Sequence, residues 1–85
     1  MARVYHLAAR YDNSKEFYGK AIVICESDGR IILQSYSTRV AEISANGKTL
    51  TIHSWDSKTT ARHIKEFALQ HGFGLVAYGA TKVQR

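Results

Sequence analysis

The side chains best suited to chemistry gather in residues 53–73, which read HSWDSKTTARHIKEFALQHGF. This stretch contains three of the four histidines, the only tryptophan and three of the twelve Lys and Arg residues. Histidines at suitable spacing bind metals or transfer protons, whereas a tryptophan among basic residues binds nucleic acid or a protein partner. A third alternative is purely structural, namely a helix with the turn that precedes it. Each alternative requires a different spacing of residues.

A metal site is not indicated by the spacing. Zinc sites need three or four converging ligands, and a helix usually supplies a histidine pair four residues apart. His63 and His71 are eight residues apart, and His53 belongs to the segment before the helix. The only cysteine, Cys25, cannot form a thiolate cluster by itself. We therefore expect no metal.

A catalytic site is not indicated either. Cys25 lies in an apolar segment, where a thiol is usually inert packing. The seven Asp and Glu residues form no pair at a spacing that suits acid–base catalysis. Phosphate-binding and dinucleotide-binding glycine motifs are both missing from the sequence. We expect a protein that is not an enzyme and that needs no cofactor.

The net charge of +5 favours an anionic partner. Aromatic side chains on exposed sheet positions could stack bases, namely Trp55, Tyr36, Tyr5 and Tyr11. Basic side chains could contact phosphates, namely Arg39, Lys48, Lys58, Arg62 and Lys65. The basic residues are scattered, however, and form no polybasic run. Aromatic residues also pack well in strands, and a tryptophan just before a helix often clamps the chain there. Nucleic-acid binding and a structural role for these aromatics both stay open.

The elements that position these side chains are those of one domain, residues 1–85, without a linker, a repeat or a proline. A chain of this length buries about 60–65% of its unfolded surface, enough for one sheet and one helix. Asp28-Gly29 and Asn46-Gly47 each predict a hairpin, because their central turn positions favour positive φ. Alternation and β-branched residues predict strands at 3–11, 20–26, 31–37, 39–44 and 48–55, with a short final strand at 74–78.

An amphipathic helix is predicted over residues 57–71. Asp56 or Ser57 can cap its first turn, and Gly72 can end it in the left-handed conformation. The periodicity places one group of side chains toward the sheet: Thr60, Ala61, Ile64, Phe67, Ala68 and His71. It places a second group largely toward solvent: Lys58, Arg62, Lys65, Glu66 and Leu69.

These elements predict an α+β fold, in which an antiparallel meander of four to six strands carries one helix on one face. One helix cannot cover a whole sheet, so the other face must be polar, bind a partner or pair with a second copy of the chain. No apolar run approaches the roughly 18 residues of a membrane span, and the N-terminus MARVYHLAAR does not resemble a signal peptide. We expect a reduced intracellular compartment and no membrane contact.

The segments SYSTRVAEI, NGK, HSW and TTARHIKEFALQHGF resemble a small domain that recurs in bacteriophage proteins of unknown function. Its pattern is Ser-Tyr-x-Thr-x-Val-Ala-x-Ile, a hairpin, a tryptophan and then Thr-Thr-x-Arg-His-Ile-x-Glu-Phe. The resemblance covers roughly residues 18–73, and the matching positions include Ser35, Tyr36, Trp55, Thr59, Thr60, Arg62 and His63. It implies a phage-encoded protein that acts in the cytoplasm of a host bacterium, and it supplies no catalytic residues.

The leading hypothesis from the sequence is a small non-enzymatic phage protein that binds and modulates a host protein. The alternatives are a nucleic-acid-binding accessory protein and an oligomeric assembly subunit. The residues expected to bind the partner are Tyr36, Arg39, Trp55, Lys58, Arg62 and His63. In this hypothesis Arg62 and His63 present two donors beside Trp55. The alternative is that Thr59, Thr60, Arg62 and His63 are structural.

Overall fold

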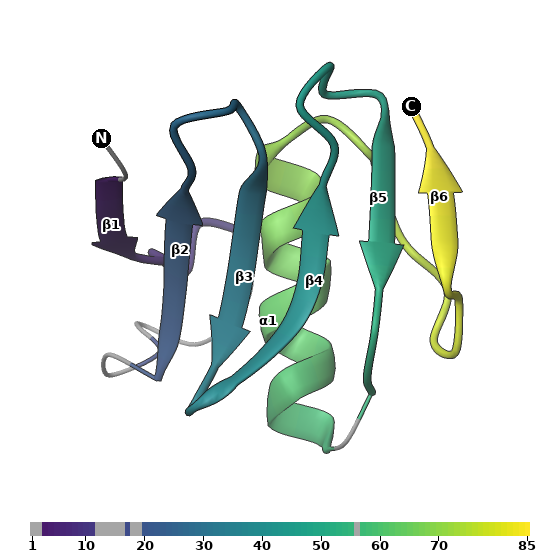
Figure 1. Ribbon diagram of the computed structural model, residues 1–85. Coiled ribbons are helices and arrows are strands. Elements are labelled where there is room, and N and C mark those ends of the chain that lie inside the picture. Colours follow the sequence, from purple (N-terminus) through teal and green to yellow (C-terminus); the bar gives the residue numbers. More distant parts are fainter. Residues whose placement is uncertain (1–2, 12–16, 18–19, 56) are drawn as a thin grey trace.

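The protein consists of a six-stranded antiparallel sheet and one helix, which confirms the predicted α+β class (Figure 1). The computed structural model describes residues 3–11, 17, 20–55 and 57–85. The strands lie side by side in chain order, as expected of a meander. The elements are β1 (Arg3–His6), β2 (Ala21–Cys25), β3 (Ile31–Ser35), β4 (Thr38–Ile43), β5 (Thr49–Ile52), α1 (Lys58–Gln70) and β6 (Lys82–Gln84).

Both predicted hairpin turns are confirmed, although their geometry differs from the expectation. Only the glycines have positive φ, 100° at Gly29 and 73° at Gly47. The preceding Asp28 and Asn46 act through their side chains instead. Each Oδ1 atom accepts a hydrogen bond from the backbone N–H two residues further on, at 3.0 Å in both turns. These local hydrogen bonds close the β2–β3 and β4–β5 turns.

The turn between β3 and β4 has no glycine. Tyr36 occupies it with φ = 58°, a left-handed conformation that costs a non-glycine residue on the order of 1 kcal/mol. Its backbone N–H donates to the carbonyl of Lys20 at 2.7 Å, and the Lys20 ammonium lies over its ring. A register shift next to Leu33 and Gln34 leaves Val40 as an extra residue in β4. The Lys20 contacts therefore hold a turn that the sequence does not favour.

Two predicted strands are wrong in extent or position. The first strand ends at His6 rather than at residue 11, and residues 7–11 cross over to the helix. The predicted strand at 74–78 is an irregular connection, whereas the predicted tail contains β6. Val83 in β6 lies opposite Leu50 in β5, and β6 is therefore the sixth strand of the sheet. Positive φ values at Gly74 and Gly79 accompany this irregular connection.

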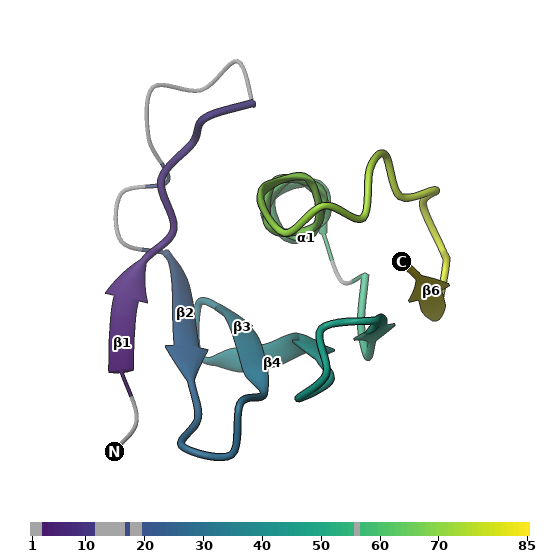
Figure 2. The same cartoon turned by 90° about the horizontal axis from the view of Figure 1, so that it is seen from above.

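Helix α1 lies on one face of the sheet, over β3 and β4, and the opposite face is open in the described part of the chain (Figure 2). The residues between the helix and the sheet form a continuous core, in which each large side chain contributes about 1.5–3 kcal/mol. Its members are Leu7, Phe17, Ala21, Val23, Leu33, Val40, Ala41, Ile43, Leu50, Ile52, Ile64, Phe67, Ala68 and Val76. The predicted one-sided architecture is therefore correct.

The helix begins and ends as the sequence predicts. The Ser57 hydroxyl accepts a hydrogen bond from the Thr60 backbone N–H at 3.1 Å and so caps the first turn. The alternative cap, Asp56, lies outside the described residues. At the other end Gly72 has φ = 82°, and its N–H donates to the carbonyl of Leu69 while the N–H of Phe73 donates to Ala68. This pair of bonds is the Schellman arrangement.

A buried polar cluster joins the first half of α1 to the end of β3. The Ser35 hydroxyl lies 3.1 Å from the Thr60 hydroxyl and 2.9 Å from Nδ1 of His63. All three side chains are buried. Phe17 packs edge-on against the imidazole, with ring centroids 4.6 Å apart. Because polar groups in a core destabilise it unless they find partners, this cluster fixes where the helix sits along β3.

We expect Ser57→Ala to lower the free energy of unfolding by about 1 kcal/mol, because the first helical turn loses its cap. Urea denaturation followed by circular dichroism measures this change. Ser27→Ala, which removes an exposed serine hydroxyl from the β2–β3 turn, is the matched control and should have little effect. Equal stability of the two variants would show that the cap contributes nothing.

Ser35→Ala should lower the free energy of unfolding by about 1–3 kcal/mol, because Nδ1 of His63 loses its hydroxyl partner in the core. The exposed Ser37 in the neighbouring turn provides the control substitution to alanine. Urea unfolding of both variants checks the prediction. If Ser35→Ala is no more costly than Ser37→Ala, the cluster does not hold the helix.

Candidate functional site

A groove lined by basic side chains runs along the solvent side of α1. Lys58, Arg62 and Lys65 are all exposed, and their spacing places them in one stripe of the helix. Together with Ala61 and Tyr78 they line a cavity of about 490 Å³. We call these five residues the basic groove. Its floor is the apolar Ala61, and its rim is cationic.

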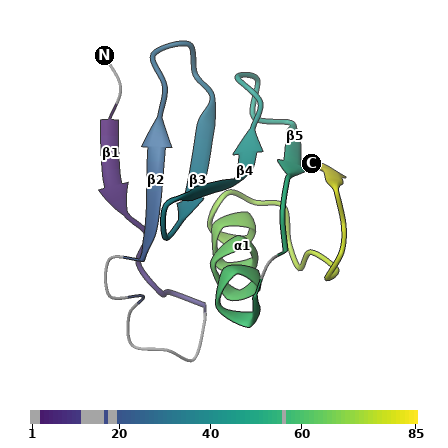
Figure 3. The same cartoon turned by 60° about the horizontal axis from the view of Figure 1, so that its bottom comes forward.

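The far wall of the basic groove comes from residues 74–80, which return beside β5 after the helix (Figure 3). Val76 anchors this segment in the core. Trp55 fixes its position, because its indole N–H donates to the carbonyl of Ala80 at 2.7 Å. The rings of Trp55 and Tyr78 lie 5.2 Å apart, and the Tyr78 hydroxyl donates to the Trp55 carbonyl at 3.4 Å. The groove wall is thus held by a buried anchor and a tryptophan clamp.

The stripe becomes apolar beyond Lys65. Leu69 follows on the same side of the helix, and Leu75 and Tyr11 flank it from the two segments that lie beside α1. These side chains, with Lys65 and Glu66, line a smaller hollow of about 170 Å³. Leu75 is 87% exposed and Tyr11 is 62% exposed. The helix side of the protein therefore presents cations at one end and exposed apolar side chains at the other.

Acidic side chains of the described residues are placed away from the basic groove. Asp28 belongs to the β2–β3 turn, and Glu42 lies on the open face of β4 opposite Thr51. Arg30 forms ion pairs with both, at 2.9 Å to Asp28 and 3.7 Å to Glu42. Hydrogen bonding from the Arg30 backbone N–H lowers the pKa of the Asp28 carboxyl. Arg30 thus forms ion pairs with both carboxylates, Asp28 and Glu42, at this end of the sheet.

Glu66 is an exception to the predicted helix pattern, which places it toward solvent. The structure buries it, with only 1% of its surface exposed. One of its oxygens accepts from the Tyr11 backbone N–H at 2.8 Å, and the other accepts from Nε2 of Gln70 at 2.5 Å. The pattern fails here because residues 7–11 cross the helix and cover the position.

The sequence-predicted binding residues fall into three groups. Lys58 and Arg62 both line the basic groove. Trp55 lies beside the groove but serves as the clamp of residues 74–80, so its structural alternative is supported. The prediction that His63 presents a donor on the surface is wrong, because the ring is fully buried against β3. The partner of its Nδ1 is the Ser35 hydroxyl.

Tyr36 and Arg39 lie apart from the basic groove. Tyr36 is half-exposed in the β3–β4 turn, with its ring 6.1 Å from the His63 ring. Arg39 is exposed and pairs with Gln34 across the β3–β4 ladder. The structure does not bring either residue together with Lys58 and Arg62.

The sequence names Lys65 among the possible phosphate contacts, and its spacing of seven residues from Lys58 places both on the same helix stripe. It predicts no binding role for Tyr78, since the place of Tyr78 depends on the contact between Trp55 and a segment 25 residues further along the chain. Within the described residues, no three His, Cys, Asp or Glu side chains come close enough to hold a metal ion. In the same part of the chain, no helix is long and apolar enough to cross a bilayer.

Comparison with known proteins places the chain in a family. No curated protein and no solved structure matches it. A family model described as "Family of unknown function (DUF8033)" matches residues 5–82, which is nearly the whole 85-residue chain. The match is longer than the predicted resemblance over residues 18–73 and includes the second half of β1, the basic groove and the start of β6. The chain therefore belongs to this family of unknown function.

Proposed function

We propose that this protein is a non-enzymatic binding protein that docks a protein partner on the helix side. The partner places acidic side chains in the basic groove and apolar side chains against Leu69 and Leu75. The supporting observation is the change of character along the helix side of the protein. The cations Lys58, Arg62 and Lys65 give way to the half-buried Leu69, with the exposed Leu75 and Tyr11 beside it. Exposed apolar groups beside charged ones are typical of protein interaction sites.

Rigid walls strengthen this proposal. The clamp of Trp55 on Ala80 and the burial of Val76 order residues 74–80 before any partner arrives. A preordered surface loses less conformational entropy on binding, so more of the contact energy appears as affinity. Tyrosine and arginine, which Tyr78 and Arg62 supply here, are also enriched among the residues that dominate binding energy.

The resemblance of the sequence to a phage domain supports a host protein as the partner. On that basis the protein is phage-encoded, acts in the host cytoplasm and modulates a host protein. Lys58 and Arg62 contact this partner, and Trp55 supports the wall of the groove. Tyr36 and Arg39 lie off this surface, and His63 acts only through the position of the helix.

Capture from a lysate of the host bacterium, after nuclease treatment, tests the proposal with two substitutions. The variant Lys58→Glu/Arg62→Glu/Lys65→Glu should lose the captured protein, because its acidic groups would meet like charges. Leu75→Ser should weaken capture by about tenfold, because an exposed apolar contact is removed. Binding of the purified partner to each variant by calorimetry gives the affinities.

The matched control reverses three exposed charges elsewhere, in the variant Arg39→Glu/Lys48→Glu/Lys82→Glu. This variant has the same net charge as the groove variant and should retain the partner. Thermal unfolding of all variants ensures that each is folded. Loss of the partner in the control as well, or its retention in the groove variant, would contradict a site on the helix side.

A nucleic-acid partner is the second candidate, and the alignment of Lys58, Arg62 and Lys65 beside Tyr78 favours it. Such a groove follows a phosphate backbone while the tyrosine stacks on a base. The groove, rather than the sheet, would be the binding surface. On the open face, one described cross-strand row is aliphatic and polar, without an aromatic side chain: Val4, Ile24, Ile32, Glu42, Thr51 and Lys82.

If nucleic acid is the partner, binding to single-stranded DNA or RNA should weaken steeply with salt. With three phosphate contacts, the slope of log K against log salt is about −2. Lys58→Gln should make that slope smaller by roughly 0.7, because one contact is lost. Fluorescence anisotropy at two salt concentrations measures both values. Leu75→Ser leaves this binding unchanged, and absence of binding at low salt removes the candidate.

A further inference from the structure

A further cavity lies at the other end of the helix, apart from the basic groove. It has a volume of about 530 Å³ and is lined by Arg3, Tyr5, Arg10, Tyr11, Gln70 and His71. No residue is shared with the basic groove. Ligand-binding cavities commonly have volumes of about 300–1,000 Å³. We call it the arginine pocket.

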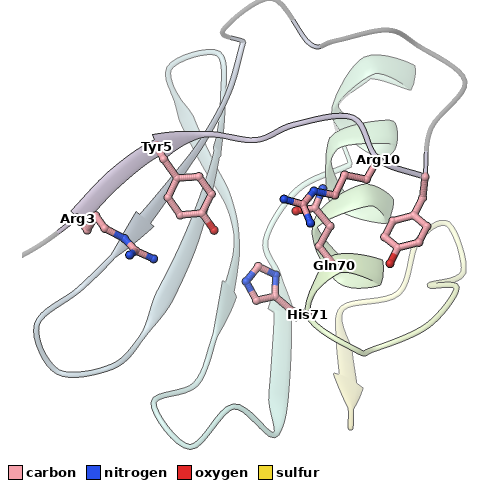
Figure 4. A pocket seen from close by; sticks show the side chains of 6 residues that line it. Arg3, Tyr5, Arg10, Gln70 and His71 are labelled. Atoms are coloured by element: carbon pink, nitrogen blue, oxygen red, sulfur yellow. The ribbon is translucent and has the colours of Figure 1, made fainter.

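The arginine pocket is assembled from three parts of the chain (Figure 4). Arg3 and Tyr5 come from β1, Arg10 comes from the segment that crosses the helix, and Gln70 and His71 come from the end of α1. In the figure the Tyr5 hydroxyl and the imidazole face the space between β1 and the helix. Side chains that are distant in sequence thus surround one space.

Hydrogen bonds to the helix and one core contact hold the walls of this pocket together. Nε2 of Gln70 donates to the Ala8 carbonyl at 2.6 Å and to Glu66 at 2.5 Å. The other oxygen of Glu66 accepts from the Tyr11 backbone N–H. Leu7, buried in the core, fixes the start of the same segment. Arg10 and Tyr11 are therefore presented by a segment that is tied to the helix near both of them.

The chemistry of the lining is cationic and aromatic. Arg3 lies over the Tyr5 ring, with Cζ 5.5 Å from the centroid. Burial raises the pKa of the Tyr5 hydroxyl, while the charges of Arg3 and Arg10 act in the opposite direction. The hydroxyl therefore keeps its proton as a hydrogen-bond donor, and it interacts electrostatically with both guanidinium groups. No carboxylate of the described residues lines the pocket, because Glu66 points its oxygens into the bonds that tie the walls together.

His71 adds a nitrogen whose role is fixed by its partner. Its Nδ1 lies 2.9 Å from the Phe67 carbonyl and must donate to it, because a carbonyl only accepts. The neutral ring then has an acceptor at Nε2, and the protonated ring has a second donor there. The end of α1 itself carries partial negative charge, so any attraction for an anion must come from the two arginines and the other donors.

We propose that the arginine pocket binds a small phosphate monoester of the nucleotide class. Arg3 and Arg10 hold the phosphate in charge-assisted hydrogen bonds, with the Tyr5 hydroxyl as a further donor. The exposed ring of Tyr11 provides a stacking surface for the base. Adenosine monophosphate serves as the probe, because it combines one phosphate with one flat ring system.

Calorimetric titration at low salt with AMP, adenosine and inorganic phosphate tests this assignment. AMP should bind saturably with a Kd below about 1 mM, and each of the two fragments should bind at least about tenfold more weakly. Arg3→Gln and Arg10→Gln should each weaken AMP binding by about tenfold or more, because a charged hydrogen bond is lost. Tyr11→Ala should weaken AMP but not inorganic phosphate.

Lys82→Gln is the matched control, because it removes one exposed positive charge from β6 outside the pocket. It should leave AMP binding unchanged. Backbone amide shifts in two-dimensional NMR spectra should change at residues 3–11 and 70–71 on titration with AMP. The same spectra show whether each variant is folded. If an arginine variant unfolds, the affinities of Tyr11→Ala for AMP and for inorganic phosphate still test the proposal.

Three results would overturn the proposal: no saturation at about 10 mM AMP, equal affinity for adenosine and AMP, or an equal loss of affinity in the Lys82→Gln control. The ligand could be a free nucleotide or the 5′-phosphate end of a nucleic-acid strand. Titration with a short oligonucleotide that carries a 5′-phosphate distinguishes these two ligands. Affinity no greater than that of AMP supports the free nucleotide, and affinity about tenfold greater overturns it in favour of the strand end. Tyr11 also lines the hollow beside Leu69, but Arg3 and Arg10 lie outside both that hollow and the basic groove. The two arginine variants therefore separate these outcomes from those of the proposed protein partner.

Discussion

The contact of Ser35 with Thr60 and His63 is the constraint on which the placement of the helix depends. Apolar side chains alone allow a helix to slide or rotate on a sheet at small cost, because dispersion contacts are not directional. Buried hydroxyl and imidazole groups do not allow this, since each must find a partner in the core. The cluster therefore sets how far α1 lies along β3, and with it which helix stripe faces solvent and which residues meet β1.

The two candidate binding surfaces arise where irregular segments lie beside this fixed helix. Residues 7–11 are held by Leu7 and by the bonds of Glu66, and residues 74–80 are held by Val76 and by Trp55. Each segment lines a different surface, the first the arginine pocket and the second the basic groove. Scaffolds commonly place binding residues on such connections, because elements of the core have little freedom to present side chains. Both proposed binding surfaces therefore lie on the helix side and not on the open sheet face.

The open face has a different character at its two ends. On the strands near the N-terminus, Val4, Ile24 and Ile32 lie in one cross-strand row, whereas Glu42, Thr51 and Lys82 continue that row toward β6. Ile32 is almost fully buried, because its neighbours in the row shield it, although it belongs to the face without a helix. A sheet can thus leave one face in solvent by covering its aliphatic centre with its own flanking side chains.

The sequence alone determined the features that rest on local physics. Glycine-containing turns, helix periodicity and the caps at Ser57 and Gly72 gave the α+β class, five of the six strands and the helix bounds to within about one residue. Burial of His63 and Glu66, the clamp role of Trp55 and the sixth strand were decided by tertiary structure. Their causes are contacts between segments 25 or more residues apart, such as Ser35 with His63 and Tyr11 with Glu66. The periodicity of a helix cannot predict such contacts. A helix position that the periodicity places toward solvent is buried when a distant segment of the chain crosses over it.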